Sequence, residues 1–359
     1  MLLFQRLSGM RLACLALAAV VVAACALADA PASAAPPAHA SPGASVYGRP
    51  RQNPNVYVTA SGLYVSWQTS RTAALDELSR VGAATGRIEA ERYLGAELID
   101  ALTADGWLWA TVSTSANAIT LLRLNPATLA VTGRHMLGTR ETGGAYLAAA
   151  GGGLWVAVGG KLLRLSLPGG RVTTAVTLRN ADDSMAAVNA AGTILLDGEA
   201  DEGAGAVQRR DPRTGRLLAS APMLGVIEPW VGGVIDSGVW VSEATGMMGY
   251  AERLNLATLK PEPLALPAPD PEGGKTYIEG TNDIATTVAD GLVWITDGET
   301  GTQLNYCADA RNGRRLAAIP LPHPYTDVVL AIGTRYIYYV SSSQYLSRVP
   351  IPARCHAGT

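Results

Sequence analysis

Charge is scarce in this sequence, and neither sign predominates. The 359 residues include 28 lysines and arginines against 30 aspartates and glutamates, which gives a formal net charge of −2. Because no stretch is dense in Lys and Arg, the chain lacks the electrostatic footprint of a nucleic-acid-binding protein. With 16% charged and 48% hydrophobic residues, the composition is that of a globular protein rather than a disordered chain or a polytopic membrane protein.

Long helical patterns and familiar catalytic motifs are also missing. No sustained helical period of apolar residues occurs after the N-terminal segment. The sequence contains no G-x-x-x-x-G-K-[ST], H-E-x-x-H, G-x-S-x-G or C-x-x-C. Nothing therefore supports a nucleotide-binding P-loop, a zincin, a serine hydrolase or a dithiol redox site. The 39 glycines and 21 prolines favour a chain with many tight turns.

Only four cysteines are present, and two of them lie in an N-terminal export signal. Arg6 and Arg11 precede an apolar run over 12–27, which is typical of a signal peptide and too short for a comfortable membrane span. The sequence V-A-A-C at 22–25 resembles the bacterial lipobox, so Cys25 is the predicted lipidation site. Ordinary signal peptidase acting near A-D-A at 28–30 is the alternative. We expect an exported protein, held at the outer face of the cytoplasmic membrane as a lipoprotein or secreted.

The remaining two cysteines, Cys307 and Cys355, form an even pair in an exported chain. Such a pair predicts a disulfide, and two unpaired thiols are the alternative. The predicted organisation is a signal peptide over 1–25, an Ala/Pro/Ser-rich flexible linker over 26–45, a folded domain over 46–355 and a tail over 356–359.

One pattern recurs along the folded domain at intervals of about 45 residues, the period of a propeller blade. Each copy begins with a turn glycine followed by a β-rich, often aromatic run. The seven glycines are Gly62, Gly106, Gly153, Gly192, Gly238, Gly291 and Gly333. A second short strand follows each run and carries, at what we take to be one position, Arg80, Arg123, Arg164, Arg209, Arg253, Tyr306 and Arg348.

An apolar run before each glycine and a β run after each arginine complete four antiparallel strands per copy. The sequence therefore predicts an all-β, seven-bladed β-propeller. Four tryptophans should pack between blades, and the arginines should reach backbone carbonyls there: Trp109, Trp155, Trp240 and Trp294. Because the chain ends soon after Cys355, the last blade lacks an outer strand, and residues 45–49 are predicted to supply it.

The recurring G-L-W-V strand followed by L-x-R-L-x-P-x-T resembles the YVTN-type and streptogramin-lyase-like β-propellers. It is similar, more loosely, to the quinoprotein propellers that bind pyrroloquinoline quinone. The resemblance covers about residues 55 to 350 and implies architecture more than activity. Streptogramin lyases carry a catalytic histidine beside glutamates that hold magnesium, and no H-x-E or E-x-H pair occurs here.

One rim of the predicted propeller has longer loops, and binding sites favour such a rim. Aligned by their glycines, Asp197, Glu243 and Asp297 stand at equivalent positions there on blades 4 to 6. We therefore predict a ligand or cation site on this rim, built from Asp197, Glu228, Trp230, Glu243, Tyr277, Glu279, Asp283, Asp297, His323, Tyr325 and Asp327.

Clustered carboxylates favour a bound cation, whether Ca²⁺, Mg²⁺ or an amine. Trp230, Tyr277 and Tyr325 would supply a stacking or cation-π wall for an organic cation. His323 is the histidine best placed to act as a general base, and an exposed loop histidine is the alternative. The alternative for the whole set is a row of solvated turn residues.

The predicted function is a monomeric binding or scaffold module, and no catalytic residue is predicted. Its partner would be a small cationic ligand or a protein at the long-loop rim. A divalent-cation-dependent lyase or hydrolase is the first alternative, and a quinoprotein-like cofactor-binding propeller is the second.

Overall fold

Contacts divide the chain into two units, Met1–Ala40 and Ser41–Thr359, and every described residue belongs to the second. Residues 1–44, with Cys25 and the cleavage site, lie outside the described part. The computed structural model describes residues 45–47, 52–69, 76–83, 85–114, 118–139, 144–178, 187–190, 193–199, 205–223, 228–244, 249–264, 278–280, 284–297, 305–322, 328–340 and 346–356.

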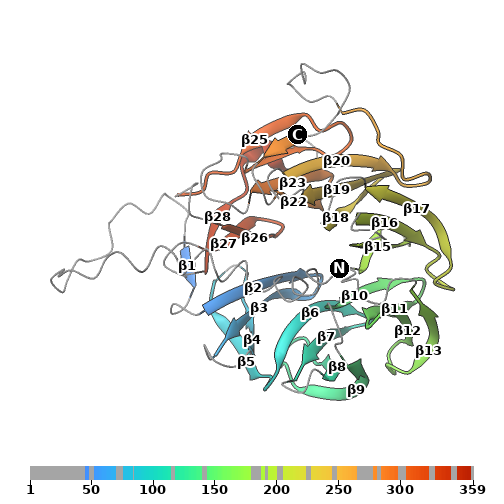
Figure 1. Ribbon diagram of the computed structural model, residues 1–359. Helices are drawn as coiled ribbons and strands as arrows, with labels where there is room; N and C mark the ends of the chain where they lie inside the picture. Colours follow the sequence, from blue (N-terminus) through green and yellow to red (C-terminus); the bar gives the residue numbers. More distant parts are fainter. Residues whose placement is uncertain are drawn as a thin grey trace, which may run out of the picture. The chain divides into compact units, whose positions relative to one another are not determined.

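The described strands form seven four-stranded antiparallel sheets, which we number as blades 1 to 7 in chain order (Figure 1). Strands are given from the innermost (A) to the outermost (D). Blade 1 contains β2 (Gln52–Thr59), β3 (Gly62–Gln68), β4 (Asp76–Val81) and β5 (Ile88–Tyr93). Blade 2 contains β6 (Glu97–Ala104), β7 (Trp107–Ser113), β8 (Ala118–Leu124) and β9 (Val131–Thr139). Blade 3 contains β10 (Ala145–Ala150), β11 (Gly153–Val158), β12 (Lys161–Ser166) and β13 (Val172–Thr177).

The second half of the ring repeats the same order. Blade 4 contains β14 (Ala187–Ala190), β15 (Thr193–Glu199), β16 (Gly205–Arg210) and β17 (Leu217–Met223). Blade 5 contains β18 (Glu228–Ile235), β19 (Gly238–Ala244), β20 (Gly249–Asn255) and β21 (Ile278–Gly280). Blade 6 contains β22 (Ile284–Ala289), β23 (Leu292–Asp297), β24 (Tyr306–Asp309) and β25 (Arg315–Ala318). Blade 7 contains β26 (Val328–Ile332), β27 (Tyr336–Val340), β28 (Leu346–Pro350) and β1 (Ser45–Tyr47), and a 3₁₀ turn, η2 (Ala353–Cys355), follows it.

The blades follow one another around a ring. Neighbouring inner strands touch in the order β2, β6, β10, β14, β18 and β22, β23 touches β26, and β26 returns to β2. The predicted all-β propeller of four-stranded antiparallel blades is therefore confirmed. Within the described residues there is no α-helix, and none of the helical structure is long or apolar enough to cross a membrane.

The A and B strands of most blades are joined by two-residue turns whose chemistry the sequence supplies. In blade 2 the turn is Asp105-Gly106, with φ of 51° and 76°, and in blade 6 it is Asp290-Gly291, with φ of 51° and 79°. Two successive positive φ values are the geometry that Asp-Gly favours, and they match the twist of the flanking strands. These dipeptides therefore fix the register of their hairpins.

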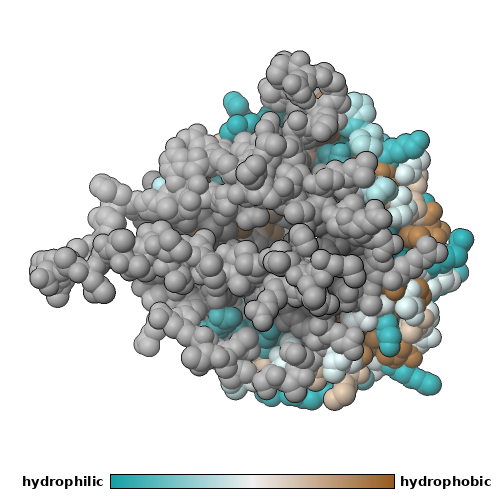
Figure 2. Space-filling view, viewed as in Figure 1, coloured by the Kyte–Doolittle hydropathy of each residue, from teal (hydrophilic) through white to brown (hydrophobic). Residues whose placement is uncertain are grey.

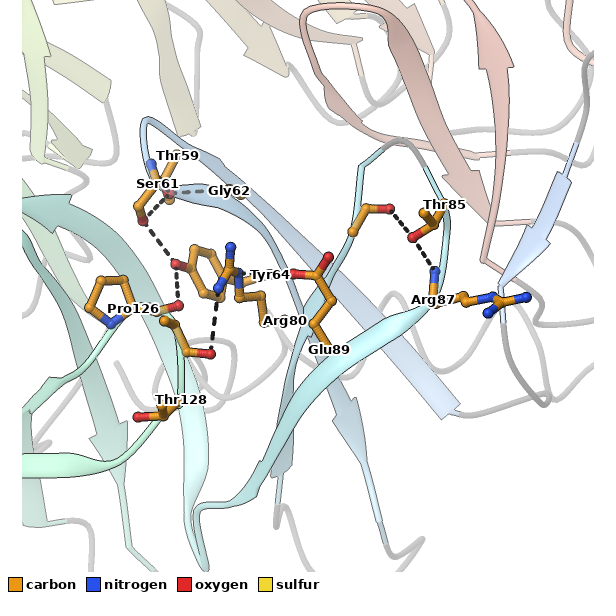
Figure 3. Close-up of polar contacts among 12 residues, drawn as sticks. Thr59, Ser61, Gly62, Tyr64, Arg80, Thr85, Arg87, Glu89, Pro126 and Thr128 are labelled. Carbon is orange, nitrogen blue, oxygen red and sulfur yellow. Dashed lines mark hydrogen bonds and ion pairs between the residues drawn. The ribbon is translucent and has the colours of Figure 1, made fainter.

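Side chains of the B and C strands bond several blades to the next one, as Figure 3 shows for blades 1 and 2. Tyr64 of blade 1 donates its hydroxyl to the Pro126 carbonyl of blade 2 at 2.9 Å. In the same way, Trp155 of blade 3 donates Nε1 to the Pro212 carbonyl of blade 4 at 3.0 Å. Arg123 of blade 2 donates to Pro168 O of blade 3 at 2.7 Å. Tyr64, Trp155 and Arg123 thus make contacts between blades, as the repeat predicts, whereas Arg164 donates to the Gly151 carbonyl of its own blade.

Two different devices hold blade 7 in place. Strand β1 pairs antiparallel with β28, so the N-terminal segment supplies the outer strand that the C-terminus lacks. The prediction that residues 45–49 close the ring is confirmed for Ser45–Tyr47. On the other side, Cys307 of β24 and Cys355 of η2, 48 residues apart, form a disulfide with Sγ atoms 2.03 Å apart. Closing a loop of this length stabilises the fold by about 4 kcal/mol in the chain-entropy model.

One part of the repeat alignment was wrong by a residue. Arg123 pairs with Trp109 and Arg253 with Trp240, but the residue that pairs with Trp294 is Cys307 rather than Tyr306. In blade 6 the position of the repeated arginine is therefore occupied by a disulfide cysteine. The arginine contact between blades and the disulfide are two uses of one register position.

The outer strands form the edge of the propeller. On the face seen in Figure 2, hydrophobic and hydrophilic side chains alternate along the edge over β13 and β17. The large apolar side chains exposed there include Val172, Leu217 and Leu218. Scattered apolar residues on an outer strand are ordinary surface features. The buried large side chains instead lie between the blades, with Trp109, Trp155 and Trp240 all at 0% exposure.

Candidate functional site

The two rims of the propeller differ in the strand connections that form them. We call the end with the A–B and C–D connections the turn rim, and the end with the B–C and D–A connections the loop rim. On the turn rim, Asn125 Oδ1 accepts hydrogen bonds from the Ala127 and Thr128 amides at 2.9 and 3.0 Å. Asp211 and Asn255 cap the corresponding turns of blades 4 and 5 in the same way. Asn125, Asp211 and Asn255 are therefore engaged in holding their own turns.

The predicted site residues that the structure describes all lie near the loop-rim ends of blades 4 to 6. Asp197 is in β15, Glu228 and Trp230 are in β18, Glu243 is in β19, Glu279 is in β21 and Asp297 is in β23. Tyr277, Asp283, His323, Tyr325 and Asp327 lie outside the described residues. For the five carboxylate residues in these strands the structure describes the backbone.

Backbone register corrects the alignment of the three carboxylate positions. Counted from the residue that occupies the tryptophan position, Glu243 follows Trp240 by three, Asp297 follows Trp294 by three, and Asp197 follows Leu195 by two. A one-residue difference moves a position to the other face of a sheet. The sequence alignment was wrong because the glycine used to align the repeats is the last turn residue in blades 2 and 6 but the first strand residue in blade 5.

Blade 5 brings several of the predicted positions into adjacent rows. Glu243 pairs with Pro229 on one side and with Tyr250 on the other, and Tyr250 in turn pairs with Glu279. In the next rows, Glu228 pairs with Ala244, and Trp230 pairs with Ser242. Trp230 is 50% exposed on the innermost strand, which is unusual for a tryptophan in this protein.

Two aspartates that the sequence did not single out, the buried Asp76 and the half-buried Asp100, lie between the blades on the opposite side of the ring. Asp76, 4% exposed, accepts a hydrogen bond at Oδ2 from the Leu98 amide of blade 2 at 2.8 Å. Asp100 of blade 2 accepts one at Oδ2 from the Leu147 amide of blade 3 at 2.7 Å, and Oδ1 accepts from Ala101 N. Each carboxylate therefore ties one blade to the next.

Burial changes the acidity of these groups. Burial raises the pKa of Asp76 and of Asp100 to about 6, although backbone hydrogen bonds lower both and the nearby Glu97 charge further raises that of Asp76. Burial also raises the pKa of Tyr57, with Asp100 as the next cause. The signal that could have found Asp100 is its place in the middle of the apolar run Ile99–Leu102.

A seam is the contact between two successive blades, and seams 2/3 and 5/6 share the same register rows. Asp100 pairs with Thr111 in blade 2, as Trp230 pairs with Ser242 in blade 5. Thr111 Oγ1 donates to the Ala145 carbonyl of blade 3. Ser242 Oγ, equally buried, has no hydrogen-bond partner among the described residues. One row therefore holds blades together in seam 2/3 and leaves a hydroxyl unpaired in seam 5/6.

Metal-ligating residues do not converge within the described part of the chain. No group of three or more His, Cys, Asp or Glu side chains there could hold a metal ion. The described residues therefore offer an exposed indole and buried hydroxyls rather than a formed metal centre.

The comparisons with known proteins show the fold and no closer kinship. No family model matches the chain. No curated protein matches it. Among solved structures, it is similar to the crystal structure of the WD40 domain from Toxoplasma gondii coronin, with a TM-score of 0.53 and 11% identity over 83% of this chain and 81% of that one. At this identity the likeness shows the fold alone, and the chain is a β-propeller.

Proposed function

We propose that this protein is an exported, lipid-anchored binding propeller that takes a cation or a small cationic ligand at the loop rim of blades 4 to 6. Within this proposal it is a propeller of the YVTN-type or streptogramin-lyase-like kind. Within the same proposal, catalysis is not its main role.

The observation that carries the proposal is the exposure of Trp230. The tryptophans of the repeated inter-blade position are buried at 0 to 1% exposure, whereas Trp230 is 50% exposed on the innermost strand of blade 5. An indole face at the rim of a propeller gives an organic cation a surface of negative electrostatic potential. A tryptophan needed only for packing would be expected in the core.

Charge at the same end of the blade supports a cationic ligand. Glu228 is two residues from Trp230 along β18, and the row Glu243, Tyr250 and Glu279 crosses the same blade. The strands of Asp197 and Trp230, β15 and β18, are in contact. Acidic groups gathered at one rim repel one another, and a bound positive charge relieves that repulsion.

Calorimetric titration with Ca²⁺, Mg²⁺ and n-butylammonium tests the proposal. The triple variant Asp197→Asn, Glu243→Gln, Asp297→Asn should bind these cations at least about tenfold more weakly than the parent, since each substitution removes an attractive charge. The matched control places three neutralising substitutions on the turn rim: Asp105→Asn, Asp236→Asn and Asp290→Asn. Equal binding by both triple variants, or no binding by the parent, would refute the site.

Anchoring has its own test. Mass spectrometry of the membrane fraction should find Cys25 diacylated at a new N-terminus. A soluble chain beginning at Pro31 would instead show cleavage by ordinary signal peptidase, and the lipid anchor would be rejected while the binding site would stand.

A further inference from the structure

Seam 5/6 contains two hydroxyl-bearing side chains, Ser242 of blade 5 and Thr286 of blade 6, and Ser242 pairs across the strands with Trp230. Trp240 Nε1 donates to the Ala310 carbonyl of blade 6 at 2.7 Å, so this face of β19 is turned toward blade 6. Ser242, two residues along the same strand, is on the same face, and so is its cross-strand partner Trp230. Ser242 and Trp230 are therefore turned toward blade 6.

Thr286 approaches the same seam from blade 6. It pairs with Ile295, which packs with Trp240 in one buried cluster, so Thr286 is turned toward blade 5. Gly232, the bulge residue of β18, lies directly against Thr286. A Cβ at Gly232 would collide with Thr286 Oγ1 and the Thr286 carbonyl. The bulge thus brings the inner strands of blades 5 and 6 together two residues from Trp230.

Neither hydroxyl is used by the fold. Ser242 and Thr286 are each 1% exposed, and Ser242 Oγ and Thr286 Oγ1 have no hydrogen-bond partner among the described residues. A buried hydroxyl without a partner destabilises the folded state. Two of them in one seam, beside an exposed indole, point to a group that binds there.

Seam 2/3 shows what the same rows do when they serve only the fold. The position of Ser242 is taken by Thr111, whose Oγ1 donates to the Ala145 carbonyl. The position of Thr286 is taken by Leu147, which packs in the core and donates its amide to Asp100. At equivalent positions, seam 5/6 therefore has Thr286 where seam 2/3 has the apolar Leu147. It also has the exposed indole of Trp230 where seam 2/3 has the hydrogen-bonded carboxylate of Asp100.

We propose that seam 5/6 at the loop rim binds the primary ammonium group of a small organic amine. The inference deepens the proposed function and rests on it. Ser242 Oγ and Thr286 Oγ1 accept two of the three N–H bonds, and the face of Trp230 lies against the cation.

The chemistry of the donor set selects this ligand class over two others. Ca²⁺ requires six to eight oxygen ligands and gains nothing from an indole face. A quaternary ammonium would stack on Trp230 but has no N–H to donate to the two hydroxyls. A primary ammonium uses both features.

The test compares n-butylammonium with tetramethylammonium, titrated by calorimetry into the parent and into the double variant Ser242→Ala, Thr286→Val. The parent should bind n-butylammonium, and the double variant should bind it about tenfold or more weakly, because hydrogen bonds to a charged group are lost. Affinity for tetramethylammonium should be the same in both proteins. Trp230→Ala should weaken both ligands. Thermal melting checks that each variant folds, and the single variant Ser242→Ala serves if the double variant does not.

The outcomes separate this inference from the broader one. Equal n-butylammonium binding by the parent and the double variant would overturn the seam site while leaving a cation site on the rim. A parallel loss of tetramethylammonium binding in the double variant would overturn the hydrogen-bonding role of the two hydroxyls. A parent that binds neither ammonium ion nor a divalent cation would refute the proposed function itself.

Discussion

Seams 2/3 and 5/6 are built from the same repeat, but the equivalent residues have different roles in the two seams. In seam 2/3, Asp100 and Thr111 bond the backbone of the next blade. In seam 5/6, the equivalent Trp230 is half exposed and the equivalent Ser242 is unpaired. In the proposal above, substitution at a few register positions converts one inter-blade contact into a binding site, while the other seams hold the ring.

The largest expected effect distinguishes the two kinds of tryptophan. Trp109→Ala, in seam 2/3, should lower the free energy of unfolding by about 3 to 5 kcal/mol, because it leaves a cavity in the core. Trp230→Ala should lower it by less than about 1 kcal/mol, because the side chain is half exposed. Urea denaturation measures both. Similar losses for the two variants would show that Trp230 is a packing residue.

The next effect concerns the pH dependence of stability and the half-buried carboxylate of Asp100 in seam 2/3. The pKa of Asp100 is raised to about 6 in the folded state, so the folded protein binds this proton more tightly than the unfolded chain does. The contribution is greatest below the unfolded pKa, near pH 4, and is lost as pH rises through about 6. The full change corresponds to about 3 kcal/mol.

Urea midpoints of the parent and of Asp100→Asn between pH 4.5 and 7.5 test this sign. The parent should lose stability across the interval, and the variant should lose less. Asp76 remains titratable in the variant and its pKa is also raised to about 6, so a residual slope is expected. A parent and variant with parallel profiles would contradict the assignment.

The smallest expected effect is a difference in sign between the stability changes that two Thr→Val substitutions cause. Thr111→Val should destabilise the protein by about 1 to 2 kcal/mol, because it leaves the buried Ala145 carbonyl without its hydroxyl donor. Thr286→Val should leave stability unchanged or raise it by about 1 kcal/mol, because the hydroxyl it removes has no partner among the described residues. Equal destabilisation by both would mean that seam 5/6 is bonded like seam 2/3.

Much of the fold could be predicted from the sequence, because the residues that specify turns and inter-blade contacts recur in most blades. The turn dipeptides Asp105-Gly106 and Asp290-Gly291 specify hairpins locally, and the repeated aromatic and arginine residues mark the inter-blade face. The closing strand at Ser45–Tyr47 could be predicted from the room left after Cys355. These features depend on the local chemistry of turns, on the spacing of the repeats and on the number of residues that follow Cys355.

The site could be predicted less well, because it depends on strand register. The glycine used for alignment belongs to the turn in some blades and to the strand in others, so Asp197 was matched with Glu243 and Asp297 although it stands one row away. A separate one-residue error matched Tyr306 with the arginines in place of Cys307, which pairs with Trp294. Ser242 and Thr286 carry no motif, and only the pairing of strands from two blades brings them to one seam.

The most direct test of the account is the rise in melting temperature produced by n-butylammonium in three proteins: the parent, Thr286→Val and Thr111→Val. A ligand that binds only the folded state raises the melting temperature by an amount that increases with the ratio of its free concentration to its Kd. The account predicts that, at one amine concentration, the rise is preserved in the less stable Thr111→Val and reduced in Thr286→Val, although the latter is at least as stable as the parent without amine. An undiminished rise in Thr286→Val, or a reduced rise in Thr111→Val, would contradict a binding site in seam 5/6.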